Sequence, residues 1–276
     1  GTIHGIVGEN GAGKSTLMSI LYGFYQADSG QIKVFNKDFK ANSSKQSIEA
    51  GIGMVHQHFM LVDNFTVLEN VVLGSEGGAL IAESLSSARV ELTRLAKEYG
   101  LEVELDVAVE ELSVGMQQRV EILKGLYKGA KVLILDEPTG VLTPQESDEL
   151  FRIFEALKKQ GVTIILITHK LREIMSITDH VSVMRAGKMV AHRETSKTNP
   201  EELAELMIGR KVLLNIQKSK ANTGNPVLVA KNLEIDNEQG LKRVSDVSFE
   251  AHSGEILGIA GVTGNGQGTL LKALAG

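Results

Sequence analysis

Two short and almost continuous runs of apolar residues lie in the middle of the chain, and each leads into a polar or charged residue. The run Val132–Leu135 precedes Asp136, and the run Val162–Thr168 precedes His169. Runs rich in leucine and β-branched residues suit strands covered by helices on both faces, which is typical of a parallel sheet. A third run, Ile3–Val7, leads into a glycine-rich loop. The pattern predicts an α/β fold.

Helix signals separate these runs. The segment Ser15–Gly23 predicts a helix closed by its final glycine. Thr66 and Thr143 are each followed three residues later by a glutamate, Glu69 and Glu146, which is the form of a capping box. The second box opens a predicted helix with one apolar face, ended by Gly161.

An internal repeat links the two ends of the chain. Residues 1–23 align without gaps on residues 254–276, and 11 of the 23 positions are identical, including all six glycines of the first segment. Glycine tolerates positive φ, so its recurrence indicates the same tight loop twice. Two or three strands are predicted in residues 226–253, before the second copy. We expect the chain to begin inside one domain and to stop inside its duplicate.

Composition limits the classes of function. The 276 residues carry a formal net charge of −5 and no long basic run, which argues against nucleic-acid binding. No cysteine is present, so disulfides and cysteine-ligated metals are excluded. The longest apolar runs fall far below the roughly 20 residues that span a bilayer, so if a membrane is involved, the chain is expected to meet it through a partner.

The glycine-rich loop fits the P-loop pattern G-x-x-x-x-G-K-[ST], between a predicted strand and a predicted helix. Its backbone N–H groups and the helix N-terminus are expected to surround phosphate oxygens. Lys14 is expected to reach the β- and γ-phosphates, and the Ser15 hydroxyl to bind Mg²⁺. The alternative is a glycine turn that binds nothing. The predicted ATP-binding residues of this loop are Gly8, Asn10, Gly11, Gly13, Lys14, Ser15 and Thr16.

Two strand ends carry further candidate chemistry. Asp136 is expected to hold Mg²⁺, and Glu137 to orient or deprotonate the attacking water, because adjacent carboxylates at a strand end are costly without a cation. The alternative is a helix-capping acid with a solvated neighbour. His169 ends the next strand, where open α/β sheets gather ligands, and is predicted to contact the γ-phosphate. A structural histidine is the alternative.

The order of five segments, the P-loop, MVHQHF, LSVGMQQR, LILDEP and LITHK, resembles the nucleotide-binding domain of ABC ATPases. The resemblance covers residues 1–210 and, as a truncated second copy, residues 226–276, joined by a linker at 211–225. It implies a P-loop NTPase core with a mainly parallel sheet, a helical subdomain at about 66–128 and an antiparallel β subdomain, truncated in the first copy. The wording of the motifs and the tandem layout resemble importers of simple sugars and nucleosides.

The resemblance also implies residue roles. Gln57 matches the glutamine that senses Mg²⁺ and the attacking water and couples to the membrane subunit. Ser113, Gly115 and Gln117 match the signature motif, which contacts ATP held by the opposite domain. Ser113 is in addition a candidate helix N-cap. The same stretch also fits an ordinary capped amphipathic helix.

Several residues depart from the family pattern. Val114 and Met116 replace a glycine and a glutamine of the signature, and Thr143 replaces an aspartate near the domain interface. In the second loop, Gln267 replaces the lysine and Gly268 replaces the hydroxyl that binds Mg²⁺. Each lost charge-assisted bond costs on the order of 1.5–3 kcal/mol, so the second loop is predicted to bind nucleotide weakly or to hydrolyse it slowly.

The resemblance implies an ATPase subunit that powers import of a sugar or nucleoside at the cytoplasmic face of the membrane. Its expected partners are transmembrane permease subunits, a solute-binding protein and a second nucleotide-binding domain in the same full-length chain, with no nucleic acid. One alternative is a tandem ABC ATPase that acts on ribosomes or DNA without a permease. Another is a module that binds ATP weakly and turns over little.

Overall fold

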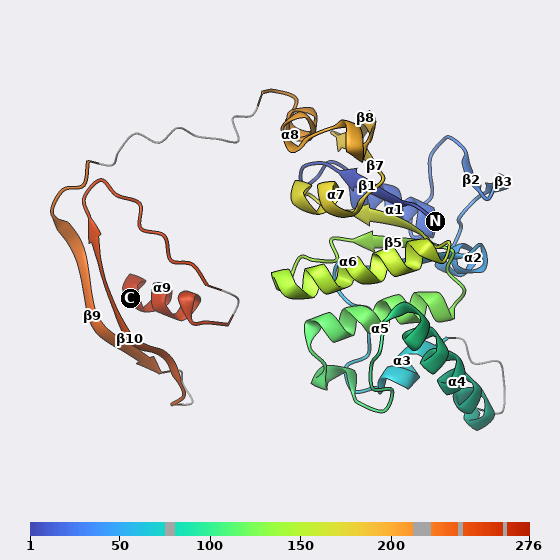
Figure 1. Cartoon of the computed structure of the whole chain (residues 1–276), viewed down its shortest axis with the longest axis horizontal. Coiled ribbons are helices and arrows are strands. Elements are labelled where there is room, and N and C mark those ends of the chain that lie inside the picture. Colours follow the sequence, from blue (N-terminus) through green and yellow to red (C-terminus); the bar gives the residue numbers. More distant parts are fainter. Residues whose placement is uncertain (75–80, 212–221, 237–239, 262–263) are drawn as a thin grey trace. The chain divides into compact units, whose positions relative to one another are not determined.

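A computed structural model describes residues 1–74, 81–211, 222–236, 240–261 and 264–276 (Figure 1). The chain forms two compact units, Gly1–Val212 and Leu213–Gly276. Most of the predicted linker, residues 212–221, lies outside the described residues, as do residues 237–239, which separate the two strands of the second unit.

A six-stranded sheet forms the centre of the first unit, in the order β4-β5-β6-β1-β7-β8. Neighbouring strands are parallel from β4 to β7, and β8 is antiparallel to β7. The three apolar runs form adjacent strands of this sheet, so the predicted parallel arrangement is confirmed. The strands are β1 (Ile3–Val7), β4 (Ile52–Val55), β5 (Val132–Asp136), β6 (Thr163–Ile167), β7 (His180–Arg185) and β8 (Lys188–Glu194).

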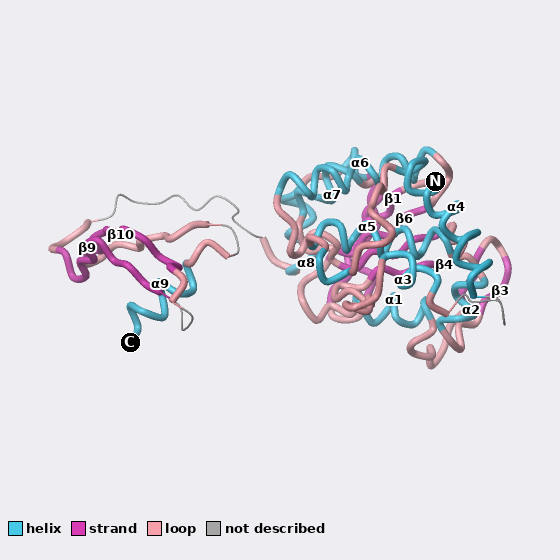
Figure 2. The backbone as a smooth tube through the Cα atoms, turned by 90° about the horizontal axis from the view of Figure 1, so that it is seen from below, coloured by secondary structure: helices cyan, strands magenta, loops and turns pink. Residues whose placement is uncertain are grey.

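Helices cover both faces of the sheet (Figure 2). On one face Ile6, Met54 and Ile134 pack with Met18 of α1, and on the other face Ile3 and its neighbours pack with the helices that follow β5 and β6. This two-sided burial explains why the strands read as continuous apolar runs. The helices of the first unit are α1 (Lys14–Tyr22), α2 (Ser44–Glu49), α3 (Val67–Val72), α4 (Ile81–Tyr99), α5 (Val114–Tyr127), α6 (Pro144–Lys159), α7 (Leu171–Ile177) and α8 (Pro200–Ile208).

The predicted helix starts are confirmed. Thr66 and Thr143 each accept a hydrogen bond from the backbone N–H of the glutamate three residues on, and each glutamate side chain accepts one from the threonine N–H. Ser113 caps α5 by accepting from the N–H of Met116. The sequence reading did not predict α2, the strands β7 and β8, or the hairpin of β2 (Ile32–Val34) and β3 (Lys37–Phe39).

The helices α3, α4 and α5 pack against one another at the β4 side of the sheet. No helix in the described part of the chain combines the length and apolar character needed to cross a membrane.

A fully buried asparagine, Asn70 of α3, holds the turn that leads into the group of helices α3, α4 and α5. Its Oδ1 accepts from Val62 N at 2.7 Å, and its Nδ2 lies 3.0 to 3.2 Å from the carbonyl oxygens of Val62, Phe65 and Thr66.

The second unit contains an antiparallel hairpin of β9 (Pro226–Asp236) and β10 (Lys242–His252), followed by α9 (Gln267–Ala275). The residues aligned with β1, 256–260, are not a strand here, and Ile256 is 93% exposed. β1 receives hydrogen bonds from β6 and β7 on its two sides. The described residues of the second unit supply no parallel strand for the repeat, so its backbone groups have no ladder to join.

Replacing Asn70 with leucine is expected to destabilise the first unit, because the Val62 N–H and the three carbonyl groups lose a buried partner. Orphaned groups of this kind cost on the order of 1–3 kcal/mol each, so a loss of roughly 2–4 kcal/mol is expected. Thermal unfolding followed by circular dichroism measures it. The exposed Asn42→Leu is the matched control, and equal melting temperatures for both variants would contradict the assigned role.

Candidate functional site

The candidate residues from four separate sequence segments meet at one edge of the sheet. β4, β5, β6 and β1 are neighbours in that order and all run in the same direction, so their carboxyl ends lie side by side. The first segment after β4 contains Gln57, β5 ends in Asp136 and Glu137, β6 is followed by His169, and β1 by the P-loop. Crevices at the carboxyl ends of parallel strands are where open α/β sheets bind ligands.

The P-loop has the backbone shape that its glycines permit. Gly11 and Gly13 have φ values of +80° and +96°, a region that favours glycine. Gly8 is required for a different reason, which is lack of space: a Cβ atom there would lie 2.2 Å from the carbonyl oxygen of Met184. The first turn of α1 contains no acidic residue, so the positive end of the helix is open to an anion.

Lys14 lies folded over this loop. Its side chain is buried, and its Nζ donates hydrogen bonds to the carbonyl oxygens of Gly8 at 2.8 Å and Glu9 at 3.0 Å. These two hydrogen bonds hold the ammonium group against the start of the P-loop. Asn10, Gly11, Ser15 and Thr16 are exposed around it, so phosphate oxygens have access to both backbone and side-chain donors.

Asp136 is a buried carboxylate that accepts a hydrogen bond from the Ser15 hydroxyl. Burial raises the pKa of Asp136 above its ordinary value, and the nearby charge of Glu137 raises it further. The hydrogen bond from Ser15 and the positive charge of Lys14 oppose this rise. Burial makes the ionised form of Asp136 costly, and a cation bound beside it would stabilise that form.

The donor set fits Mg²⁺. Ser15 and Asp136 supply hard oxygen ligands, and Mg²⁺ in phosphate sites takes few protein ligands and completes its shell with water and phosphate. No group of three or more His, Cys, Asp or Glu in the described residues has the geometry of a metal site. The structure thus brings Ser15 and Asp136 together, whereas Gln57 stays exposed after β4.

Glu137 and His169 form a pair. His169 Nδ1 lies 2.9 Å from Glu137 Oε1, although the two residues are 32 positions apart in the chain. Glu137 has a φ of +49°, in the left-handed region that non-glycine residues seldom adopt. Backbone outliers of this kind cluster at functional sites, where the surrounding structure maintains them.

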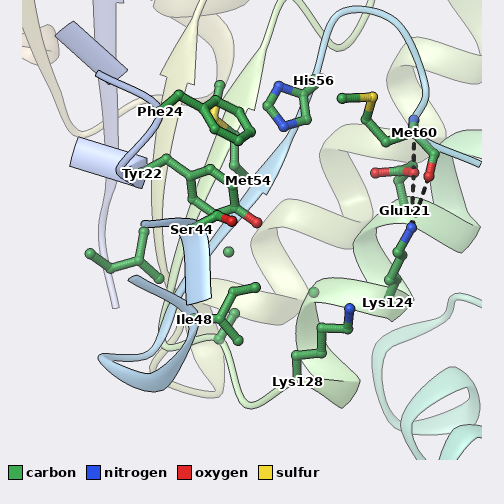
Figure 3. A pocket seen from close by; sticks show the side chains of 14 residues that line it. Tyr22, Phe24, Ser44, Ile48, Met54, His56, Met60, Glu121, Lys124 and Lys128 are labelled. Atoms are coloured by element: carbon green, nitrogen blue, oxygen red, sulfur yellow. Dashed lines mark hydrogen bonds and ion pairs between the residues drawn. The ribbon is translucent and has the colours of Figure 1, made fainter. Parts of the chain in front are cut away.

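The segment that follows Gln57 is anchored to α5 next to a pocket of about 180 Å³ (Figure 3). Met60 N donates to the buried Glu121 at 3.1 Å, and Lys124 Nζ donates to Met60 O at 2.9 Å. Burial raises the pKa of Glu121. Tyr22, Phe24, Met54 and His56 are among the residues that line the pocket. The pocket therefore adjoins the glutamine segment and the end of α1.

The signature segment lies on a different part of the unit. Ser113, Gly115 and Gln117 start α5, where Gln117 Nε2 donates to Val109 O and Leu112 O, both at 3.2 Å. Gly115 lies against α6, since a Cβ atom there would be 3.0 Å from Glu146 Oε1. Gly115 thus lies beside α6, whereas Gln117 bonds the segment that precedes α5.

Two glycines of the second loop have the same backbone conformation as their counterparts in the first. Gly264 and Gly266 have φ values of +93° and +91°, close to those of Gly11 and Gly13. A Cβ atom on Gly261 would meet Gln267 Nε2 at 2.1 Å, so the amide folds back over the loop as the ammonium of Lys14 does. What the second loop lacks is the positive charge and the hydroxyl.

One group of residues next to the site was not singled out from the sequence. Thr139, Thr168 and Glu173 are buried behind Glu137 and His169, and Lys170 joins them. Glu173, four residues after His169, does not by itself indicate a functional residue in the sequence, because its partner Thr139 follows a different strand.

Comparisons with known proteins agree on the family. The family model described as "ABC transporter" matches residues 1–140. The chain is 48% identical over 276 residues to the nucleoside import ATP-binding protein NupA of Lactococcus lactis subsp. cremoris, covering all of this chain and 54% of that protein. It is 44% identical over 304 residues to the glucose import ATP-binding protein TsgD13 of Haloferax volcanii, covering all of this chain and 55% of that protein.

The chain therefore spans about half the length of these curated relatives. Among solved structures, a nucleotide-free ATP-binding cassette from an ABC transporter matches with a TM-score of 0.65 and 27% identity, over 76% of this chain and 88% of that one. This match confirms the predicted α/β fold. With a family model that covers residues 1–140 and a cassette fold around the P-loop, the chain belongs to the ABC transporter family.

Proposed function

We propose that this chain belongs to the ATP-binding and ATP-hydrolysing subunit of an importer for a small solute, a sugar or a nucleoside. The observation that carries the proposal is the meeting of the P-loop, Gln57, the Asp136–Glu137 pair and His169 at the ends of four neighbouring parallel strands. The import names of the relatives, which include nucleoside and glucose transport, support the choice of solute class.

In this proposal the P-loop amides and the Lys14 ammonium bind the triphosphate of ATP. Ser15 and Asp136 would hold Mg²⁺, with Gln57 of the segment after β4 as a further proposed ligand, and the bound ion would supply positive charge that neutralises the phosphate oxygens. Glu137 orients the attacking water and accepts its proton. His169 keeps Glu137 in place through the 2.9 Å contact and faces the γ-phosphate. Rate enhancement comes from positioning and charge stabilisation.

We assign residues 1–210 to a first nucleotide-binding domain with a helical subdomain at about 66–128, residues 211–225 to a linker, and residues 226–276 to the start of a second domain. Ser113, Gly115 and Gln117 would contact nucleotide held by the opposite domain. The proposed partners are transmembrane permease subunits and a solute-binding protein, with the ATPase on the cytoplasmic face of the membrane.

Glu137→Gln in the full-length protein is expected to keep MgATP binding and to lower turnover by about 100-fold or more, the usual scale for loss of a general base. Lys14 and Ser15 remain intact in this variant, so affinity is retained. Calorimetry and a phosphate-release assay measure the two quantities. Glu102→Gln, on an exposed residue, is the matched control, and unchanged turnover in Glu137→Gln would refute the role of Glu137.

Gln267→Lys is expected to strengthen nucleotide binding at the second loop. Residue 267 aligns with Lys14, so a lysine there would place its ammonium group as Lys14 does in the first loop. One restored charge-assisted contact is worth on the order of 1.5–3 kcal/mol, or roughly a 10- to 100-fold lower Kd. Calorimetry in the Lys14→Ala background isolates the second loop. If affinity stays the same there, loss of the lysine does not explain the weak site.

A further inference from the structure

A buried polar network lies directly behind Glu137 and His169. Thr139 and Thr168 are each 1% exposed, and Glu173 is 8% exposed. The Glu173 carboxylate accepts a hydrogen bond from the Thr139 hydroxyl on one oxygen and from the Thr168 hydroxyl, at 3.1 Å, on the other. A carboxylate buried to this degree requires such donors.

Lys170 closes the network from its solvent side. Its Nζ donates to the carbonyl oxygen of Thr139 at 2.9 Å and lies 3.3 Å from Glu173 Oε1. Its backbone N–H donates to the Thr168 hydroxyl at 3.0 Å. The first turn of α7 and the end of β6 are thereby tied to Thr139, which belongs to the segment after β5.

Thr139 sits inside the turn that fixes Glu137. The backbone N–H of Gly140 donates to Glu137 O at 3.1 Å, and the N–H of Glu137 donates to Ile167 O at 2.9 Å. The turn holds Glu137 at a φ of +49°. A non-glycine residue keeps such a conformation only where surrounding contacts determine it. The side chain and carbonyl of Thr139 supply contacts of this kind, and their partners are Lys170, which follows His169, and Glu173 of α7.

We infer that Glu173, acting through Thr139 and Lys170, is a positioning residue for the Glu137–His169 pair. It fixes the turn at 137–140 relative to the end of β6, and so keeps Glu137 Oε1 within hydrogen-bond distance of His169 Nδ1. The inference rests on the proposed function, in which Glu137 orients the water. Misplacement of a catalytic group by a fraction of an ångström lowers turnover without changing the contacts that bind the nucleotide.

The test compares Thr139→Val with Thr139→Ser in the full-length protein. Valine keeps the shape of threonine but removes the hydroxyl, whereas serine keeps the hydroxyl. Thr139→Val is expected to lower kcat for MgATP by about 10- to 100-fold at unchanged KM, and Thr139→Ser to retain most of the turnover. Thr93→Val is the matched control, since the exposed Thr93 hydroxyl also donates one hydrogen bond, to Arg89 O. Lys170→Met, at a side chain that is 40% exposed, decides the test if Thr139→Val does not fold.

A double variant separates positioning from general loss of structure. In the Glu137→Gln background, Thr139→Val is expected to cause no further loss of turnover, because the group that it positions is already gone. An additive loss, an effect on KM alone, or full turnover in Thr139→Val or Lys170→Met would overturn the inference and leave the proposed function standing. Absence of MgATP turnover in the unaltered protein would overturn both.

Discussion

The parallel direction of four neighbouring strands is the constraint on which the candidate site depends. β4, β5, β6 and β1 are distant in sequence, yet hydrogen bonding in one direction brings their carboxyl ends to a common edge. Each strand then needs to contribute only the residues that follow it. The apolar runs that bury the strands on both faces are therefore also what aligns the polar residues, and packing and site geometry have the same origin.

Much of this arrangement was predictable because the signals are local. A continuous apolar run that ends in a carboxylate, as at Leu135 and Asp136, contains both the strand and the candidate ligand. The capping boxes at Thr66 and Thr143 are equally local, since all their hydrogen bonds lie within four residues. The P-loop is local as well, because its tight turn needs positive φ values, which glycine adopts readily.

The features that escaped prediction lack a clear local pattern or depend on partners far away in sequence. β7 and β8 form an antiparallel pair, and β8 is largely exposed, so its sequence alternates weakly. The role of Glu173 can be recognised only from its contact with Thr139, which lies in the segment after β5. The repeat at residues 256–260 shows the converse, because a sequence that matches β1 in pattern forms no strand where the described part of the second unit supplies no parallel neighbour.

The second glycine loop separates two properties that are combined in the first. Its shape is set by glycines such as Gly264 and Gly266, while its chemistry is set by the side chains at Gln267 and Gly268. Losing the lysine leaves the backbone unchanged, so single substitutions can restore the chemistry. Losing a glycine at the position of Gly8 would instead press a Cβ atom against a carbonyl oxygen at 2.2 Å. Sequence change at the side-chain positions can therefore alter the chemistry of such a loop and leave its fold intact, whereas change at the glycine positions alters the fold itself.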